Sequence, residues 1–292
     1  MPFLTGLEHC VRPDEPLAPH TWFKLGGPAE FFAEPTSLDE LTTIVRRSRD
    51  EGRAVRMLGG GSNVLVRDEG VSGVVIQLAA PAFGQIEARG QTVTAGGGAR
   101  LAHVISTSVR EGLAGLETLV GMPGVIGAAL HNNSGSHGGD IGQFVTRATV
   151  MTRDGEIQAR SRQEMSFGYR ESSLDDLVIL SAEFELEKDD PEVLTKRMQK
   201  QWIAKKALQP MAHQNAGCIF RNPGGTSAGM LIDQAGLKGV RIGGVEVCDR
   251  HANFFVADPD AKTADVLRLI ELVKSTVLER TGIELKPQIE IW

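Results

Sequence analysis

The sequence predicts a protein of mixed α and β structure, and its 292 residues are enough for two or three lobes. Helix-type and strand-type patterns alternate near the N-terminus. Its 34 glycines gather in clusters between apolar, strand-like runs. Glycine permits positive φ and lets the backbone come close to another group, so several such clusters favour a large ligand held by main chain.

The first predicted helix begins after Ser37. The sequence Ser-Leu-Asp-Glu at 37–40 is typical of a capping box, in which Ser37 and Glu40 satisfy the first backbone N–H groups of the helix. Apolar residues at helical spacing follow, and Gly52 predicts the end of the helix.

Further elements follow from the period of the apolar residues. Runs that alternate or are continuously apolar predict strands at 54–58, 63–66, 71–78, 178–186 and 252–257, a hairpin around Asp154-Gly155, and a short strand near the C-terminus. Helical spacing predicts helices at 100–113, 192–209 and 263–280, and one within 227–236 that ends at Gly236.

Composition excludes several classes of protein. A net charge of -6 and a pI near 5.7 do not suggest a nucleic-acid binder. The first ten residues do not resemble a signal peptide, and no run of 18 apolar residues predicts a membrane span. We therefore expect a cytoplasmic protein with no membrane partner.

The three cysteines are too scattered for a disulfide framework, and no CxxC or His-x-x-x-His pair marks a zinc site. We expect no metal. Cys10 and Cys248 are predicted to be ordinary thiols.

Residues 58–66, "LGGGSNVLV", predict a strand, a glycine turn and a Ser-Asn pair. Main-chain N–H groups in such a turn can hold a pyrophosphate, although a purely structural turn explains the glycines equally simply. The pattern is neither GxGxxG nor GxxxxGKS, so it predicts neither a Rossmann fold nor a P-loop.

Residues 119–142 form an apolar, glycine-rich stretch with polar side chains that need hydrogen-bond partners if buried. We expect an extended ligand to supply these partners. The polar residues are Asn132, Asn133, Ser134, Ser136 and His137.

Two further stretches could carry chemistry. In "SFGYRESS", Arg170 follows Tyr169, the only tyrosine, and its guanidinium could bind a carboxylate. In "NAGCIFRNP", Cys218 could be a small buried hydrophobe, the common fate of an unpaired cysteine, or a group that takes part in a reaction.

Together these stretches resemble the UDP-N-acetylenolpyruvoylglucosamine reductase (MurB) family. The resemblance runs from about Thr21 to the C-terminus, in the compact form of the family that lacks an inserted loop. Its landmarks occur in order: "TWFKLGGPAEFF", "LGGGSNVLV", "GLETLVGMPGVIGAAL", "FGYRESS", "AGCIFRNP", "AGMLIDQAGLKGVRIGGVEV" and "HANFFV".

The resemblance implies an α+β fold, with an FAD-binding domain of the vanillyl-alcohol-oxidase/PCMH-like type and a C-terminal substrate-binding domain. It implies one FAD-binding lobe at 1–78, joined by a strand at 283–292, a second lobe at 79–190, and the substrate-binding domain at 200–282. It also implies FAD and NADPH as cofactors. We expect a monomer and, from the charge, no nucleic-acid partner.

The implied reaction reduces the enolpyruvyl ether of a UDP-sugar, UDP-N-acetylglucosamine enolpyruvate, to UDP-N-acetylmuramate in peptidoglycan synthesis. NADPH hydride passes through FAD to the vinyl carbon, and a positioned acid donates a proton. The family position of the proton donor, usually serine, is Cys218 here, and Arg170 matches the residue that stabilises negative charge on the substrate.

The family usually has a catalytic glutamate where this chain has Gln288. Glu290 lies two residues further on, on the same face of a strand. Three alternatives follow: Gln288 suffices, Glu290 takes part of the role, or the enzyme is impaired.

The remaining roles are carried over from matching motifs. Positions that hold FAD are Gly59, Gly60, Gly61, Ser62, Asn63, Pro123, Gly124 and Ser134. Positions near the substrate are Tyr169, Asn222, Lys238 and His251.

Two other functions are compatible with the sequence. One is another FAD-dependent oxidoreductase of the same fold, against which the substrate-lobe motifs argue. The other is a non-catalytic flavin-binding or nucleotide-sugar-binding protein, which Gln288 keeps open.

Overall fold

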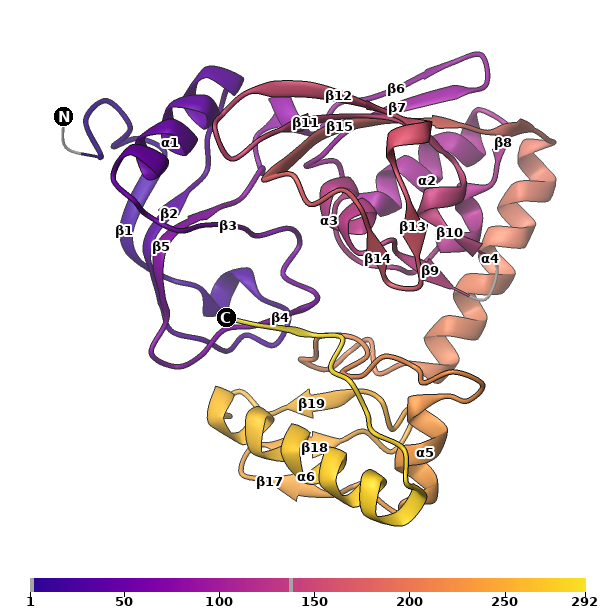
Figure 1. The fold of residues 1–292 in the computed structure, drawn as a ribbon. Coiled ribbons are helices and arrows are strands. Elements are labelled where there is room, and N and C mark those ends of the chain that lie inside the picture. The colour runs from indigo at the N-terminus through magenta and orange to yellow at the C-terminus, as the bar shows by residue number, and fades with distance from the viewer. Residues whose placement is uncertain (1–2, 137–138) are drawn as a thin grey trace. The chain divides into compact units, whose positions relative to one another are not determined.

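The structure, a computed structural model, describes residues 3–136 and 139–292 (Figure 1). His137, predicted to need a partner, lies outside the described residues. The helices are α1 (Leu38–Asp50), α2 (Leu101–Arg110), α3 (Ile126–His131), α4 (Pro191–Leu208), α5 (Ala228–Gln234) and α6 (Thr263–Thr281).

The strands are short and spread along the whole chain. The first ten are β1 (Val11–Pro16), β2 (Pro28–Ala33), β3 (Val55–Met57), β4 (Val64–Leu65), β5 (Val71–Ile76), β6 (Ile86–Arg89), β7 (Thr92–Gly96), β8 (Leu113–Ala114), β9 (Gly135–Ser136) and β10 (Gly139–Asp140). The others are β11 (Val145–Met151), β12 (Ile157–Ser161), β13 (Phe167–Gly168), β14 (Glu171–Ser172), β15 (Val178–Glu185), β16 (Glu187–Lys188), β17 (Arg241–Ile242), β18 (Val245–Val247), β19 (Phe255–Ala257) and β20 (Glu290–Ile291).

The chain forms two compact units, and neither is a continuous segment. The first unit contains Met1–Asp14, Glu30–Gly60 and Ser72–Ala204. The second unit contains Glu15–Ala29, Gly61–Val71 and Lys205–Trp292.

A five-stranded sheet with the order β12-β11-β15-β7-β6 organises most of the first unit. All its neighbouring strands are antiparallel, and α2 and α3 cover one face (Figure 1). The helices bury Leu101, Val104 and Ile126 against sheet residues such as Val93 and Phe184. Burial of this apolar surface stabilises the sheet and fixes the loops at the ends of its strands.

Helix α1 and a four-stranded sheet of order β1-β2-β5-β3 form another layer of the first unit. Leu41 and Ile44 of α1 share a core with Val74 and Ile76 of β5. Ser37 caps α1, since its hydroxyl accepts a hydrogen bond from the Glu40 backbone N–H at 3.3 Å.

In the second unit, α6 packs on the small sheet β17-β18-β19, with α5 beside it (Figure 1). Its core contains Val266, Leu269 and Val273 of α6. Residues from early in the chain, Phe23 and Leu65 among them, are part of the same core. The last strand, β20, pairs in parallel with β4.

The predicted helices are confirmed, as is the hairpin around Asp154-Gly155, which joins β11 and β12. The prediction for 100–113 was wrong at its end. Gly112 adopts a φ of 69° after Arg110, and Leu113 enters β8. Left-handed backbone there ends the helix at little steric cost because the residue is glycine.

Two other predictions were only partly right. The strand predicted at 252–257 begins at Phe255, because residues 251–254 form a turn in which the Phe254 N–H donates to the His251 carbonyl. The Glu40 carboxylate does not bond back to Ser37. It accepts hydrogen bonds from the backbone N–H and hydroxyl of Thr36, at 2.7 and 2.9 Å.

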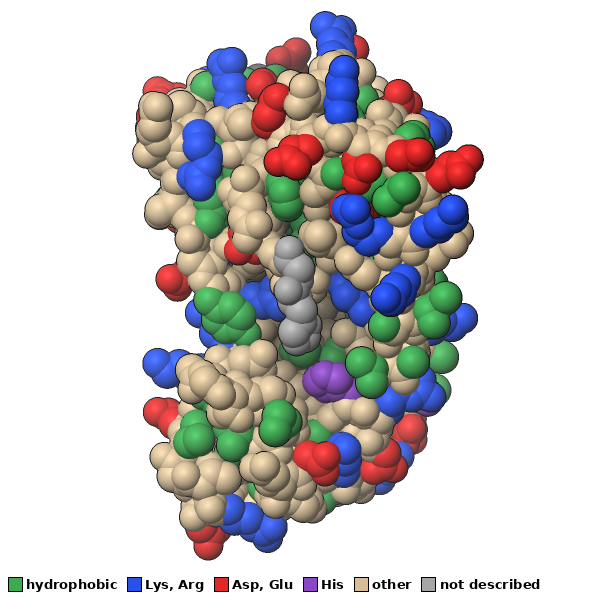
Figure 2. Space-filling model, turned by 90° about the vertical axis from the view of Figure 1, so that its right-hand side faces the viewer, with side chains coloured by type: hydrophobic (Ala, Val, Ile, Leu, Met, Phe, Trp, Pro, Cys, Tyr) green, Lys and Arg blue, Asp and Glu red, His purple; other side chains and the backbone are tan. Residues whose placement is uncertain are grey.

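No helix among the described residues is long and apolar enough to cross a membrane. On the face drawn in Figure 2, Lys and Arg side chains are interspersed with Asp and Glu side chains.

Asp68 caps α6 from another part of the second unit. Its carboxylate accepts hydrogen bonds from the backbone N–H groups of Thr263 and Ala264, at 3.1 and 3.3 Å. Asp68→Ala should lower the free energy of unfolding by about 1 kcal/mol, because these two groups lose their acceptor. Urea unfolding followed by circular dichroism measures this loss. Glu69→Ala, at the exposed neighbour, is the control, and an equal loss in both variants would contradict the capping role.

Candidate functional site

Two predicted cofactor loops of the first unit contact each other through main chain. A Cβ atom at Gly59 would lie 2.8 Å from the Cβ atom of Ala128, and one at Gly60 would lie 3.0 Å from the Cα atom of Gly124. Larger residues therefore do not fit without movement of the backbone. The carbonyl of Gly59 accepts a hydrogen bond from the Gln77 side chain at 2.9 Å, which holds the first loop.

The second loop is also anchored to a third glycine cluster, at 96–98. The N–H of Gly127 donates to the Gly97 carbonyl at 2.8 Å, and the N–H of Leu101 donates to the Gly124 carbonyl at 3.0 Å. Pro123, predicted to contact FAD, is exposed beside this anchored segment. Three glycine clusters far apart in sequence are thus held together by close backbone contacts and hydrogen bonds.

Tyr169 and Arg170 form the two-residue loop of the β13–β14 hairpin. Arg170 has a φ of 60°, which is unfavourable for a residue with a side chain, and its guanidinium lies over the Tyr169 ring at 5.6 Å. Its Nε is buried and has no hydrogen-bond partner among the described residues. A buried, unpaired donor in a strained loop is typical of a functional position.

Asn133 holds this hairpin in place. It is only 2% exposed, and its amide donates to the Gly168 carbonyl at 2.7 Å while its side-chain oxygen accepts from the Gly142 N–H at 3.0 Å. The Ser136 hydroxyl donates to the Thr118 carbonyl at 2.9 Å. The expectation that a ligand must supply partners was therefore wrong for these two side chains, because the protein supplies them.

Ser134 lies in the same loop and is half-buried. Its backbone N–H donates to the Ala129 carbonyl at 2.7 Å, and its carbonyl accepts from the Ile141 N–H at 2.9 Å. These bonds fix the backbone of Ser134 within the first unit.

In the second unit, the segment 218–221 is hydrogen-bonded on both of its edges. On one edge, the backbone of Cys218 pairs with that of Phe254 in an isolated antiparallel β-bridge, and the Ile219 N–H donates to the Asn253 carbonyl at 2.9 Å. On the other edge, the Gln288 N–H donates to the Ile219 carbonyl at 2.7 Å. The half-buried Cys218 therefore sits on a backbone with little freedom to move.

Asn253 fixes this segment further through its side chain. Its amide oxygen accepts from the Phe220 N–H at 2.9 Å, and its amide nitrogen donates to the Phe220 carbonyl at 2.8 Å. Asn253 is 2% exposed, so these bonds form in an interior where unpaired groups are costly. Asn253 was not among the predicted residues, although a lone asparagine inside the apolar stretch "ANFFVA" is a signal that could have identified it.

Ser62, Asn63 and Gln288 are brought together in the second unit. The Asn63 amide donates to the Gln288 carbonyl at 3.2 Å, and the Asn63 carbonyl accepts from the Glu290 N–H at 3.0 Å. A Cβ atom at Gly217, just before Cys218, would lie 3.9 Å from the Ser62 carbonyl. The end of one predicted cofactor loop therefore adjoins the predicted catalytic positions.

Gly61 begins that loop in the second unit. It has a φ of 67°, and a Cβ atom there would lie 2.0 Å from the His20 carbonyl, so only glycine fits. The two C-terminal candidates differ in their surroundings: Gln288 is half-buried and bonded to the segment of Cys218, whereas Glu290 is exposed in β20.

The other predicted substrate contacts gather around α5. The Asn222 side-chain oxygen accepts from the Ala228 N–H at 3.0 Å, at the start of the helix, and Lys238 pairs with Asp233 at 2.6 Å. The ring of His251 packs edge-on against Phe254, with centroids 4.8 Å apart. Burial, with a smaller effect of the Lys238 charge, lowers the pKa of His251.

Comparisons with known proteins agree with these features. Residues 29–160 match the FAD binding domain, and residues 209–292 match the C-terminal domain of UDP-N-acetylenolpyruvoylglucosamine reductase. A reductase of this name from Rhodopirellula baltica is 40% identical over 290 residues, 99% of this chain and 95% of the relative. Another, from Bacillus subtilis, is 39% identical over 284 residues, 96% of this chain and 93% of the relative.

Solved structures are similar as well. UDP-N-acetylenolpyruvylglucosamine reductase (MurB) from Thermus caldophilus matches with a TM-score of 0.82 and 34% identity, over 97% of this chain and 98% of that one. Phl p 4.0202, a glucose dehydrogenase, has a TM-score of 0.52 at 12% identity, over 65% of this chain and 45% of that one, and shows the fold alone.

The fold and the glycine-lined loops, with these matches, define an FAD-containing oxidoreductase. Its FAD-binding domain is of the PCMH-like type and precedes a distinct C-terminal domain, as predicted. The chain belongs to the UDP-N-acetylenolpyruvoylglucosamine reductase family, whose cofactors are FAD and NADPH and which acts in peptidoglycan synthesis.

The residues present fit FAD. The contact between Gly59–Gly60 and Gly124 fixes the backbone of both loops. Backbone N–H groups in a fixed glycine turn can bind a pyrophosphate. The individual FAD contacts, and the division into lobes at 1–78, 79–190 and 200–282, stay predictions.

The backbone of Arg170 gives a prediction about stability. Arg170→Ala and Arg170→Gly both remove the guanidinium, but only glycine relieves the positive φ. The glycine variant should therefore have a free energy of unfolding about 1 kcal/mol higher than the alanine variant. Chemical unfolding of the two variants side by side measures this difference. An alanine variant as stable as the glycine variant would refute the claim of strain.

His251 gives a prediction about pH. Its lowered pKa means that the folded state binds fewer protons than the unfolded state, so stability is lost as pH falls below the ordinary histidine pKa of about 6.5. His251→Gln should reduce this loss. The measurement is the free energy of unfolding at a series of pH values between about 7 and 5. A loss of stability as steep in His251→Gln as in the wild type would contradict this prediction.

Proposed function

We propose that the protein reduces UDP-N-acetylglucosamine enolpyruvate to UDP-N-acetylmuramate at the expense of NADPH, with Cys218 as the proton donor. When bound, FAD would supply the hydride chemistry that links NADPH to the vinyl carbon of the substrate. The observation that carries the proposal is the immobilisation of the "AGCIFRNP" segment on both edges, which holds Cys218 in one position. A proton donor must be positioned in advance to act on a short-lived intermediate.

A thiol suits this role chemically. An unperturbed cysteine has a pKa of about 8.5, so at neutral pH it carries its proton and is a far stronger acid than the serine hydroxyl usual in the family. After hydride addition, the adjacent carbon of the substrate bears negative charge and takes the thiol proton. The resulting thiolate is reprotonated from solvent before the next turnover.

Arg170 is proposed to stabilise negative charge on the substrate carboxylate. Its buried Nε without a partner supports this role, since a carboxylate oxygen would accept the hydrogen bond that the described residues do not. The strained loop fixes the guanidinium in advance, so little reorganisation is needed as charge develops. Tyr169 lies beside it and is proposed to contact the same ligand.

Gln288 is proposed to act at the position of the usual glutamate by hydrogen bonding alone. Its backbone bond to Ile219 supports this assignment over Glu290, which is exposed and paired with the 63–65 segment. An amide cannot ionise, so it can orient a carboxylate or enol but cannot transfer a proton from its own acid group. The proton then depends on Cys218.

Asn222, Lys238 and His251 are proposed to bind the UDP-sugar. Support comes from their common location around α5, where Asn222 bonds to the first turn and His251 packs beside Gly229. The charge of Lys238 suits a diphosphate.

Substitution of Cys218 tests the proton transfer. Cys218→Ala should still be reduced by NADPH at the wild-type rate, since that half-reaction needs no proton from the thiol. Turnover of the enolpyruvyl substrate should fall by a factor of about 10² to 10⁴. Stopped-flow flavin absorbance separates the two half-reactions.

Two further variants serve as controls for this experiment. Cys218→Ser should recover turnover and should lose the decline in rate at high pH that ionisation of the Cys218 thiol would cause in the wild type. Cys248→Ser, at another cysteine of the same unit, should behave as wild type. Normal turnover by Cys218→Ala would eliminate Cys218 as the donor.

A further inference from the structure

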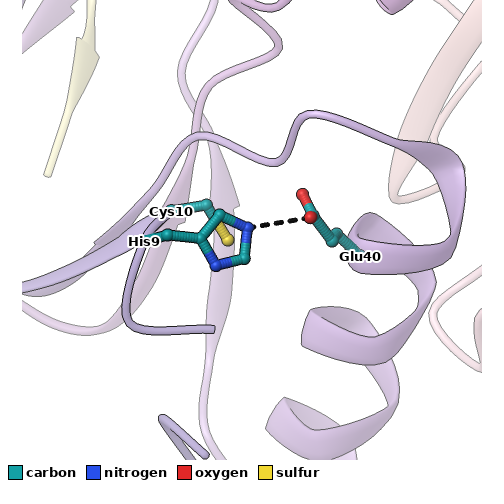
Figure 3. A group of neighbouring side chains, drawn as sticks. All are labelled: His9, Cys10 and Glu40. Carbon is teal, nitrogen blue, oxygen red and sulfur yellow. Dashed lines mark hydrogen bonds and ion pairs between the residues drawn. The ribbon is translucent and has the colours of Figure 1, made fainter. Parts of the chain in front are cut away.

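His9, Cys10 and Glu40 form a cluster of metal-ligating groups in the first unit (Figure 3). The Nε2 atom of His9 lies 2.8 Å from a carboxylate oxygen of Glu40, and one ligand atom from each residue lies within 4.8 Å of the others. His9 and Cys10 come from the N-terminal turn and Glu40 from the first turn of α1. No role in the proposed reduction involves these residues.

The environment of the cluster resembles that of a metal site. The far oxygen of Glu40 accepts hydrogen bonds from the backbone N–H and hydroxyl of Thr36, which leaves the near oxygen directed at His9. Such outer hydrogen bonds orient ligating carboxylates in metal centres. The Cys10 side chain is buried, whereas 55% of the His9 side chain is exposed, so an ion can enter from solvent.

The spacing is close to what a small tetrahedral ion requires. Zinc lies about 2.0–2.1 Å from nitrogen or oxygen ligands and about 2.3 Å from sulfur, so its ligand atoms are separated by about 3.3–3.6 Å. The 2.8 Å hydrogen bond between His9 and Glu40 must lengthen by about half an ångström, and the sulfur must approach from within 4.8 Å. Rotation of the exposed His9 side chain can provide much of this change.

We propose that His9, Cys10 and Glu40 bind one zinc ion, with water at the fourth position. Thiolate, imidazole and carboxylate together favour zinc over magnesium or calcium, which prefer oxygen ligands alone. Cys10 loses its proton to solvent on binding and ligates as thiolate. Without the ion, the thiol donates a hydrogen bond to the Leu7 carbonyl at 3.5 Å.

The bound ion would link the N-terminal turn to α1. The two already share an apolar core. Their polar contacts are the His9–Glu40 pair and Arg47, whose guanidinium donates to the carbonyls of Phe3 and Thr5, at 2.9 and 2.6 Å. Exposed ion pairs contribute little to stability. An ion that binds only the folded state adds stability that grows with its concentration.

The test is zinc binding by the purified, FAD-loaded protein without a histidine tag. Equilibrium dialysis against micromolar zinc, followed by elemental analysis, should give one zinc per chain. His9→Gln, Cys10→Ser and Glu40→Gln should each weaken binding at least about tenfold, as loss of a ligand does. Zinc should also raise the unfolding temperature of the wild type but not of His9→Gln.

Control variants isolate the cluster. His103→Gln, at an exposed histidine of α2, and Cys248→Ser should bind zinc as the wild type does. His9→Gln keeps a side chain able to bond Glu40 on the surface, so its folding should not change. The proposal is overturned if the wild type binds no zinc at micromolar concentration. It is equally overturned if either His9→Gln or Cys10→Ser binds as tightly as the wild type.

Discussion

The pair of hydrogen bonds between the Asn253 side chain and the backbone of Phe220 is the constraint on which the second unit depends. Segment 218–221 passes through the interior, where each unpaired N–H or carbonyl costs about 1–3 kcal/mol. Asn253 supplies both a donor and an acceptor at one point, and the chain end from 286 to 289 supplies the opposite edge. These bonds fix the backbone position of Cys218.

In the first unit, steric contacts contribute to fixing the backbone near the predicted site residues. Its glycine loops contact each other so closely that side chains are excluded, and Asn133 ties the Tyr169–Arg170 hairpin to the loop after α3. Arg170 is left with unfavourable backbone and an unpaired buried donor. Such local costs persist where the surrounding contacts determine the conformation completely, and they gather at positions used for binding or catalysis.

The sequence was sufficient for the elements whose signals are local. Ser37 and Gly52 mark the two ends of α1, because helix caps and positive φ depend on neighbouring residues alone. The family motifs led to the FAD-binding fold. Partners distant in sequence could not be predicted. Asn253 stands out as a lone asparagine in an apolar stretch, but no local pattern shows that its partner is Phe220. In the same way, no local pattern shows that His9 lies beside Glu40. The zinc motifs sought in the sequence have close spacing, so they overlook a ligand that lies 31 residues away.

The sequence was also insufficient where a side chain serves the fold instead of a ligand. Asn133 and Ser136 were expected to need a bound molecule, because their polarity in an apolar stretch is visible but their partners are not. The choice between Gln288 and Glu290 depended in the same way on which backbone lies beside each residue. The Gln288 N–H donates to the carbonyl of Ile219, the residue after Cys218, so Gln288 is connected more closely to Cys218 than Glu290 is.

The interleaving of the two units bears on how the chain folds as it is synthesised. The core of the second unit needs Phe23 and Leu65, which are made early, together with α6 and Ile289, which are made much later. These early apolar residues therefore stay without their final partners until the ribosome has made the residues up to about Ile289. The exposed apolar residues of such a nascent chain can bind chaperones during this period. A fragment that begins near residue 205 would lack the early residues that complete the core of the second unit.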